Sequence, residues 1–368
     1  MDLVADMLLE TLPLVSSGEI AATRLRPPMT RRWTRLPVVG NSGRARLGDR
    51  LTGRLWDYPR WLRPLRGDFD IFHIVDHSYA HLVRSLPAER TIVTCNDTDA
   101  FDAAREGSAS RLDPSRLLAA HVLDGISRAS HVACISESTR QDLIATGRVD
   151  RARTSVVYLG AHPSCTPTPD AKADAEIDRQ LGRKRFEILH VSSTIPRKRI
   201  DILLEVFNRF RKIQPDARLI RVGGPLTRTQ QRLAEQLGVV DALVQLPFLE
   251  RPQLAALYRR ASVVVLPSDR EGFGLPIVEA MACGTAVIAS DIPALREVGG
   301  SAAIYCPPGD IPRWVGVLAD FQREQMDPAA RDRRRAACIS AASKFDWKTY
   351  AAQMAELYLQ PLPRERAS

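Results

Sequence analysis

The sequence contains no long apolar run. No window approaches about 18 uninterrupted apolar residues, the length that a membrane-spanning helix requires. The first residues, Met1 to Asp6, have no basic segment leading into an apolar one, so export is not expected. With 45% apolar and 26% charged residues, the composition is that of a soluble globular protein. A chain of 368 residues is long enough for two domains, each with its own core.

Cysteines are few and scattered. None forms a Cys-x-x-Cys pair, and several lie in apolar, strand-like runs. We therefore expect small buried hydrophobic side chains in a reducing compartment, which predicts a cytoplasmic protein. The six are Cys95, Cys134, Cys165, Cys283, Cys306 and Cys338.

Positive charge is concentrated in one segment. The chain has a net charge of +9, yet Arg24–Arg66 alone holds twelve arginines against two aspartates, or +10. Trp33, Trp56, Tyr58 and Trp61 lie among these arginines. The pattern fits three interpretations: a solvated face, a peripheral contact with an anionic membrane or a pyrophosphate-bearing lipid, and, less favoured, a nucleic-acid surface.

A strand, a glycine-containing loop and a helix follow one another in the second half. The apolar run Val263 to Pro267 predicts a buried parallel strand, and Pro276 stands where a helix would start. Gly272 and Gly274 allow the backbone to pass close to a ligand. The amides of a helix's first turn can bind an anion such as phosphate.

Two carboxylates flank this turn. Glu271 lies on the loop, and we expect Glu279 in the first turn of the helix. A carboxylate accepts two hydrogen bonds, which suits it to hold sugar hydroxyls. A structural origin is also open, because the helix dipole stabilises a glutamate in a first turn and Gly-x-Gly occurs in many turns.

The amino-acid sequence of this stretch resembles the signature of retaining glycosyltransferases of the family 4 type, which have GT-B architecture. The residues that carry the resemblance are Pro267-Ser268, Glu271-Gly272-Phe273-Gly274-Leu275-Pro276 and Glu279-Ala280-Met281-Ala282-Cys283-Gly284, with the family's spacing between the two glutamates. The resemblance is clear over residues 186–310 and looser in the first half. It implies two doubly wound, parallel-sheet α/β domains of Rossmann-like type that face a cleft.

The resemblance also implies roles for residues on the donor side. Glu271 would hold the donor sugar, Glu279 the ribose, and Lys198 the donor pyrophosphate. Ser193 replaces an arginine that the family often has there, and Arg197 could supply the missing charge. The backbone of Gly272, Phe273, Gly274 and Leu275 would contact sugar and phosphate. No metal and no further cofactor is expected.

On the acceptor side the resemblance points to Asn96, Asp97 and Ser136. Asn96 stands where the family usually has histidine, and an amide cannot exchange a proton near neutral pH. Two metal-site interpretations are less favoured. One rests on Asp97 and Asp99, and the other on His73, His77 and His81, whose spacing breaks at a turn.

Prolines and charges without periodicity after Cys165 place a domain boundary there. We predict an acceptor-binding domain over 1–165, a nucleotide-sugar-binding domain over 166–345, and a segment over 346–368 whose helix crosses back to the first domain.

Residues 1–12 predict an amphipathic helix that Pro13 ends. The family begins with a strand and a glycine-rich loop, so either the reading frame starts late or this fold lacks its first strand.

The sequence thus predicts a metal-independent, retaining transfer of a hexosyl group from a nucleotide diphosphate sugar to a hydroxyl of a glycan or lipid-linked acceptor. Polysaccharide or glycolipid biosynthesis would be its setting. The alternatives are a nucleotide-sugar epimerase or hydrolase on the same fold and a catalytically silent binding protein.

Overall fold

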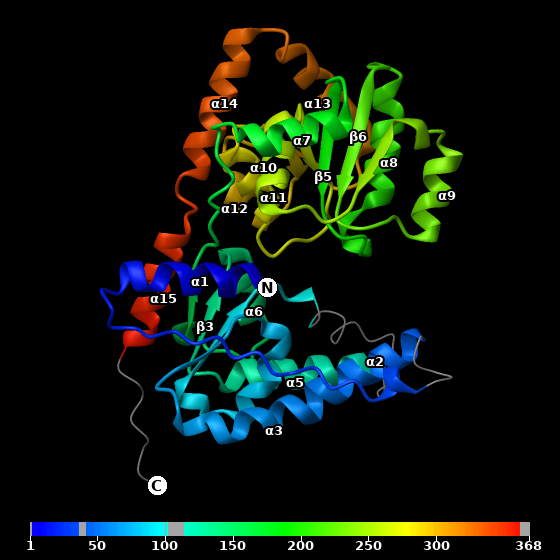
Figure 1. Cartoon of the computed structure of the whole chain (residues 1–368). Coiled ribbons are helices and arrows are strands. Elements are labelled where there is room, and N and C mark those ends of the chain that lie inside the picture. The colour runs from blue at the N-terminus through cyan, green and yellow to red at the C-terminus, as the bar shows by residue number, and fades with distance from the viewer. Residues whose placement is uncertain (1, 37–41, 100, 102–113, 361–368) are drawn as a thin grey trace. The chain divides into compact units, whose positions relative to one another are not determined.

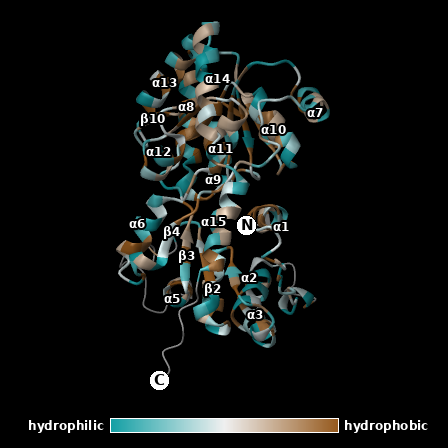
Figure 2. Ribbon diagram, turned by 90° about the vertical axis from the view of Figure 1, so that its left-hand side faces the viewer, coloured by the Kyte–Doolittle hydropathy of each residue, from teal (hydrophilic) through white to brown (hydrophobic). Residues whose placement is uncertain are grey.

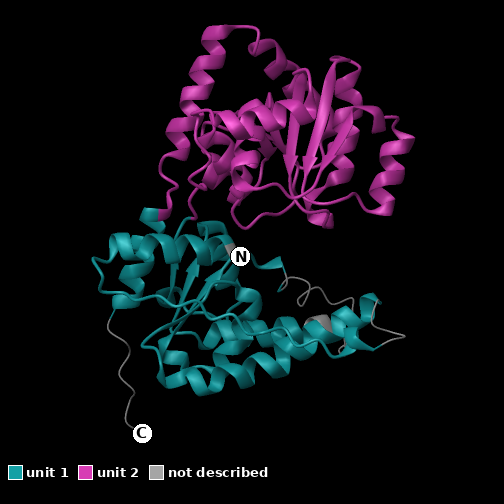
Figure 3. Cartoon of the chain, in the orientation of Figure 1, with its two compact units in different colours: residues 1–158, 348–368 teal, residues 159–347 magenta. Residues whose placement is uncertain are grey.

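The structure, a computed structural model, describes residues 2–36, 42–99, 101 and 114–360 (Figure 1). The chain forms two compact units (Figure 3). Unit 1 comprises Met1–Tyr158 and Lys348–Ser368, and unit 2 comprises Leu159–Trp347. The C-terminal end therefore belongs to the same unit as the N-terminal half.

Unit 2 is built on a six-stranded parallel sheet with the order β10-β9-β8-β5-β6-β7. The strand predicted at Val263 to Pro267 is confirmed as β8, and most of the six strands are continuous apolar runs buried on both faces, as in parallel sheets covered by helices. Their bounds are β5 Phe186–Val191, β6 Ala217–Val222, β7 Leu243–Leu246, β8 Val263–Leu266, β9 Val287–Ser290 and β10 Ile304–Cys306.

Helices connect the strands of unit 2 and cover its sheet. Hydrophobic and hydrophilic residues mix along them, as helices with one buried face require (Figure 2). They are α7 Ala171–Leu181, α8 Ile200–Arg211, α9 Arg228–Gln236, α10 Arg251–Arg260, α11 Leu275–Ala282, α12 Pro293–Gly299, α13 Ile311–Glu324 and α14 Pro328–Ala342, with the short helical turns η7 Pro196–Lys198 and η8 Val240–Ala242.

Helix α8 shows how the sequence pattern produces the packing. Its apolar stripe, including Phe207 and Phe210, is buried in the main core of unit 2. The same spacing in the sequence would extend the stripe to Ile213, but this residue lies beyond the end of the helix and is 53% exposed. The 3.6-residue period holds only as long as the helix does.

The strand order of unit 2 reverses between β5 and β8. From β5 the chain builds outward through β6 and β7. It then returns to add β8 on the other side of β5, where Ile188 pairs with Val263 and Leu189 with Val264. In an open parallel sheet, the loops at the carboxyl ends of two such strands diverge and leave a place for a ligand. The loops after β5 and β8 therefore frame the candidate site.

Unit 1 has a four-stranded parallel sheet with the order β1-β2-β3-β4. The strands are β1 Phe72–Ile74, β2 Thr91–Cys95, β3 His131–Cys134 and β4 Thr154–Val156. The first is shorter than the predicted run from Asp68 to Val75. No strand precedes β1 among the described residues, and the first element there is a helix.

The helices of unit 1 are α1 Asp2–Val15, α2 Gly43–Thr52, α3 Tyr58–Leu62, α5 Pro114–Arg128, α6 Glu137–Ala145 and α15 Trp347–Leu359. Shorter turns are η1 Trp33–Arg35, η2 Gly53–Asp57, η3 Arg63–Gly67, η4 His77–Ser85, η5 Ala88–Arg90 and η6 Arg151–Arg153. Within the described residues, no helix is both long and apolar enough to cross a bilayer.

Pro13 does not end the first helix, contrary to the prediction. Helix α1 continues through it to Val15. A proline removes one backbone hydrogen bond to the preceding turn, and so close to the helix end this loss is small. The amphipathic pattern itself is confirmed, since Val4, Met7, Leu8 and Leu12 are all buried.

Candidate functional site

The turn between β8 and α11 has a backbone that requires glycine. Gly274 has a φ of 91°, in the left-handed region, and a Cβ placed there would lie 2.6 Å from Leu295 Cδ2. Phe273 is buried and packs edge-on against Phe345, with ring centroids 5.6 Å apart. The turn is therefore fixed by packing before any ligand arrives.

Glu271, on this turn, forms an ion pair with Lys198. Lys198 Nζ donates to both carboxylate oxygens, at 2.6 and 2.7 Å. Ser268 Oγ donates to Oε1 at 2.8 Å. Only 6% of the Glu271 side chain and 14% of the Lys198 side chain are exposed. This ion pair is largely shielded from bulk water. Each side chain could nevertheless exchange its present partner for a polar group of a ligand.

The loop after β5 is hydrogen-bonded to the loop after β8. Arg197 Nη1 donates to the carbonyl of Arg270 at 2.9 Å and lies 3.5 Å from Glu271 Oε2. In return the Asp269 amide donates to the Arg197 carbonyl at 2.9 Å. The structure thus brings together three residues that the sequence analysis singled out, Arg197, Lys198 and Glu271, from the two loops at the strand-order reversal.

A buried arginine lies under the same loops. Arg221, near the end of β6, is 1% exposed and donates to two carbonyls, those of Gly224 at 2.8 Å and Ser192 at 3.0 Å. Burial lowers the pKa of Arg221, yet an arginine keeps its proton in proteins. In the described part of the chain no carboxylate pairs with it. Arg221 therefore places an uncompensated positive charge beneath the loop after β5.

His190 joins the two central strands next to Arg221. Its Nδ1 donates to the Val265 carbonyl at 2.8 Å, and its Nε2 lies 2.7 Å from Ser192 Oγ. Burial lowers the pKa of His190 to about 3, so the ring is neutral at pH 7. His190 therefore adds no charge to the site and fixes Ser192 by a hydrogen bond.

Glu279 lies deeper in helix α11 than predicted. It is the fifth residue of the helix and hence past the first turn, which contains no acidic residue. Arg251 Nη1 lies 3.1 Å from its Oε1, and Tyr258 OH donates to Oε2 at 3.0 Å. Only 2% of Glu279 is exposed, and this burial raises its pKa.

The other residues predicted for the donor side offer mainly backbone groups to a ligand. At the start of α11, Pro276 has no N–H and the Ile277 amide donates to the Gly274 carbonyl. The amides of Gly274 and Leu275 have no acceptor within the helix and could donate to a ligand. Ser193 is exposed on the loop after β5, where its carbonyl oxygen lies 2.8 Å from Ser192 Oγ. Gly272 is buried within the turn.

The residues predicted for the acceptor side lie in unit 1, and two of them, Asn96 and Asp97, contact His77. The Asn96 amide donates to His77 Nδ1 at 3.1 Å, and His77 Nε2 is 3.6 Å from Asp97 Oδ1. Because Nδ1 accepts, Nε2 carries the proton and faces the carboxylate. Burial lowers the pKa of His77, against the opposing effect of Asp97. Ser136 caps helix α6 by accepting from the Thr139 amide at 3.0 Å.

Sequence reasoning missed three of these groups. Arg221 did leave a signal, because a charged residue in the middle of a buried strand must find buried partners. His77 was considered only for a metal site, and in the described residues no cluster of three or more histidine, cysteine or acidic side chains could hold a metal. Arg251 left no signal, since nothing in the sequence links the start of α10 to Glu279.

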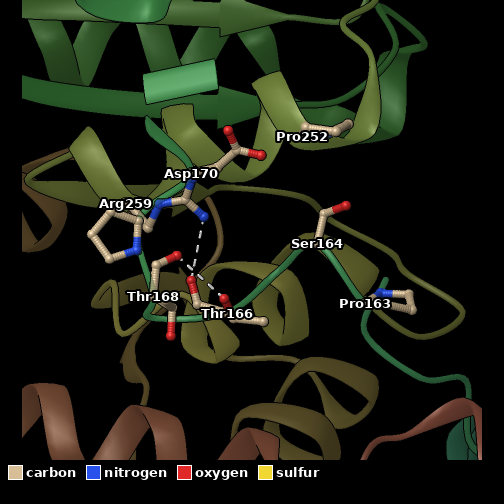
Figure 4. A pocket seen from close by; sticks show the side chains of 8 residues that line it. Pro163, Ser164, Thr166, Thr168, Asp170, Pro252 and Arg259 are labelled. Atoms are coloured by element: carbon tan, nitrogen blue, oxygen red, sulfur yellow. Dashed lines mark hydrogen bonds between the residues drawn. The ribbon is translucent and has the colours of Figure 1, made fainter. Parts of the chain in front are cut away.

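A cavity of about 340 Å³ elsewhere in unit 2 borders the start of α10 (Figure 4). Its lining consists of Pro163, Ser164, Thr166, Thr168, Pro169, Asp170, Pro252 and Arg259. The one cation in this lining, Arg259, is already neutralised by Asp174 at 2.5 Å. The charged groups that could act on a substrate lie instead at the two loops described above.

Two family models match the chain, and together they span most of it. Residues 173–345 match the model described as "Glycosyl transferases group 1", and residues 19–165 match "Glycosyltransferase Family 4". The first covers unit 2 almost entirely, including every donor-side residue discussed above.

Curated relatives match over part of their length. The D-inositol 3-phosphate glycosyltransferase of Mycolicibacterium vanbaalenii is 33% identical over 232 residues, which is 58% of this chain and 49% of the relative. The MMP alpha-(1->4)-mannosyltransferase of Mycolicibacterium hassiacum is 31% identical over 245 residues, 63% of this chain and 54% of the relative. The chain thus spans about half the length of the curated relatives it matches.

Solved structures share the fold. A sucrose-phosphate synthase from Thermosynechococcus elongatus superimposes with a TM-score of 0.73 at 20% identity, covering 97% of this chain and 92% of that one. The Anabaena protein HepE, in complex with UDP and glucose, gives a TM-score of 0.70 at 20% identity, with 84% and 83% covered.

Proposed function

The chain belongs to the family 4 type of glycosyltransferases, with the GT-B architecture of two Rossmann-like domains, and from this premise we propose a retaining, metal-independent transfer of a sugar from a nucleotide diphosphate sugar to an acceptor hydroxyl. The observation that carries the proposal is the Lys198–Glu271 pair at the strand-order reversal. There, the cation that would bind the diphosphate donates a hydrogen bond directly to the carboxylate that would bind the sugar. HepE, which shares the fold, has been crystallised with UDP and glucose.

The positive charges around this pair suit a departing diphosphate. In the proposed reaction the bond from the sugar's anomeric carbon to the β-phosphate oxygen breaks, and negative charge grows on that phosphate. Lys198, Arg197 and the amides of Gly274 and Leu275 would stabilise it, with Arg221 contributing from below. A fixed, partly buried set of donors is effective because it does not need to reorganise during the reaction.

The acceptor oxygen then forms the new bond on the same face of the sugar, and its proton passes to the leaving diphosphate. Glu271 would hold the sugar hydroxyls, and Lys198 would turn from the carboxylate to the phosphate. Glu279, fixed by Tyr258 and Arg251, would bind the ribose diol. No covalent link to the protein is required.

We propose that unit 2 binds the donor and that Asn96, Asp97 and Ser136 of unit 1 lie on the acceptor side. A glycan or lipid-linked hydroxyl would be the acceptor, in polysaccharide or glycolipid biosynthesis. A cytoplasmic location, with contact at the inner face of the membrane, fits the six buried cysteines, which are all free thiols.

A thermal-shift screen against uridine, guanosine and adenosine diphosphate sugars tests the donor class. A ligand at about 100 times its dissociation constant adds about 2.7 kcal/mol to the free energy of unfolding, so the correct donor raises the melting temperature clearly. Incubation with that donor alone separates the alternatives: an epimerase or hydrolase consumes it without acceptor, and a silent binding protein never does. A flat response to all three donor classes would contradict the proposal.

Replacing Glu271 by Gln should lower the rate of sugar transfer by about a hundredfold or more, because the carboxylate that holds the sugar and balances Lys198 is lost. Transfer is measured as release of nucleoside diphosphate in the presence of acceptor. Glu235→Gln, an exposed glutamate on α9, is the matched control and should leave the rate unchanged. Full activity of Glu271→Gln would end the assignment of this residue.

Removal of divalent ions should leave the rate unchanged. In the proposed reaction Lys198, Arg197 and backbone amides would balance the charge on the leaving diphosphate, so no metal ion would be required. The rate is compared before and after dialysis against EDTA, with magnesium restored as a control for chelator effects. A rate that falls with EDTA and returns with magnesium would show that the diphosphate needs a metal.

Arg221 should contribute to diphosphate affinity through its charge. Arg221→Gln should weaken binding of the nucleoside diphosphate about tenfold and leave binding of the nucleoside unchanged, while Arg221→Lys keeps most of the affinity. Isothermal titration with both ligands measures the difference. Arg218→Gln, on the same strand but paired with Glu187, serves as a control for stability alone. Equal weakening of nucleoside and diphosphate would show that Arg221 only shapes the loop.

A further inference from the structure

Among the described residues of the segment Arg24–Arg66, which exclude 37–41, six large apolar side chains are exposed between the arginines. They come from the chain around η1 and from the continuous helical run that begins with α2, and each is 45–58% exposed. We refer to them as the apolar-arginine surface: Met29, Trp33, Leu36, Leu47, Leu55 and Trp56. Large apolar side chains that are exposed within one short segment and flanked by charged residues are typical of an interaction site.

The two segments that carry this surface are fastened to each other. The buried carboxylate of Asp49 accepts from the amides of Arg32 and Trp33, both at 2.8 Å, and from the Thr34 amide at 3.1 Å. These hydrogen bonds lower the pKa of Asp49, so it stays ionised. Arg32 also forms a two-point salt bridge with Asp57, at 2.6 and 2.7 Å. The exposed side chains therefore stand on a fixed framework.

Arginines alternate with these apolar side chains along the segment. The exposed ones are Arg31, Arg35, Arg44, Arg46, Arg50, Arg60, Arg63 and Arg66. The only acidic residues of Arg24–Arg66 are Asp49 and Asp57, and both are engaged in the framework. The surface is thus strongly cationic, and its partner must be anionic and able to take up aliphatic side chains.

The aliphatic side chains decide between a membrane and a nucleic acid. A protein that binds a single strand does so largely by stacking bases on aromatic rings. Here Arg60 covers one face of Trp56, 3.5 Å from the ring centroid, and the Trp33 ring packs against Gly48. Leu36, Leu47 and Leu55 cannot stack on bases at all. A bilayer surface takes both groups, because arginines bind lipid phosphates while tryptophan and leucine enter the interface.

We propose that this surface binds the face of a membrane rich in anionic lipids, with Trp33, Leu47 and Trp56 entering the headgroup region and the arginines contacting lipid phosphates. The binding is peripheral and reversible, and it weakens as salt screens the charges. It would hold the protein at a surface where lipid-linked acceptors are found. Vesicle binding does not depend on sugar transfer, so a failure here would leave the donor assignment intact, and the reverse also holds.

Sedimentation of the full chain with lipid vesicles tests the proposal. We expect binding to vesicles of phosphatidylcholine with about one third phosphatidylglycerol, and little binding to phosphatidylcholine alone. Arg46→Glu combined with Arg50→Glu should weaken binding at least about tenfold. Leu47→Ser combined with Trp56→Ser should also weaken vesicle binding. The fold-loss caused by this pair should be the same at low and at high salt, whereas the fold-loss caused by the arginine substitutions should shrink as salt is added.

The matched control is Arg331→Glu with Arg333→Glu on helix α14. Both are exposed arginines, and the pair changes the net charge by the same amount outside the surface. Melting temperatures of all variants establish that they are folded. Unchanged binding by the control supports the proposal. The proposal is overturned if the control loses binding as much as the Arg46/Arg50 variant, if no variant alters binding, or if single-stranded DNA binds and displaces the vesicles.

Discussion

The reversal of strand order between β5 and β8 is the constraint on which the candidate site depends. Because these neighbouring parallel strands continue into α8 and α11 on different courses, their two loops separate at the carboxyl edge of the sheet. The backbone bond from Asp269 to Arg197 and the Lys198–Glu271 pair then tie the loops together. A basic loop and an acidic loop, distant in sequence, thus become two sides of one site.

Each of the two glutamates at this site has a cationic partner, whereas Arg221 has no carboxylate partner among the described residues. Glu271 has Lys198, and Glu279 has Arg251, so a ligand that carries both hydroxyls and phosphates can exchange with each pair without leaving a buried charge alone. Arg221 is the exception, because carbonyl dipoles rather than a carboxylate satisfy it. An unneutralised buried cation is costly in the empty protein, and a bound dianion lowers that cost. The imbalance therefore favours a phosphate-bearing ligand.

The sequence predicted unit 2 well and unit 1 less well, for a physical reason. Strands such as β5 and β8 are buried on both faces and read as unbroken apolar runs with clear ends. In unit 1, β1 is three residues long, and much of the chain before it forms short helical turns that leave little periodicity. Glu271 could be named from the chemistry of its turn, and Lys198 from the family resemblance. The partner of Glu279 could not, because Arg251 reaches it only through the packing of α10 on α11.

The apolar-arginine surface raises a question that the fold does not answer. The hydrogen bonds of Asp49 and the Arg32–Asp57 bridge hold the two segments together, and none of them involves Leu47 or Trp56. Polar side chains at those two positions would leave the framework unchanged and would hydrate better. The local charge of +10, in a chain whose other residues sum to about −1, is likewise more than solubility requires. Folding thus explains neither the apolar side chains nor the arginines, whereas contact with an anionic, partly apolar surface explains both.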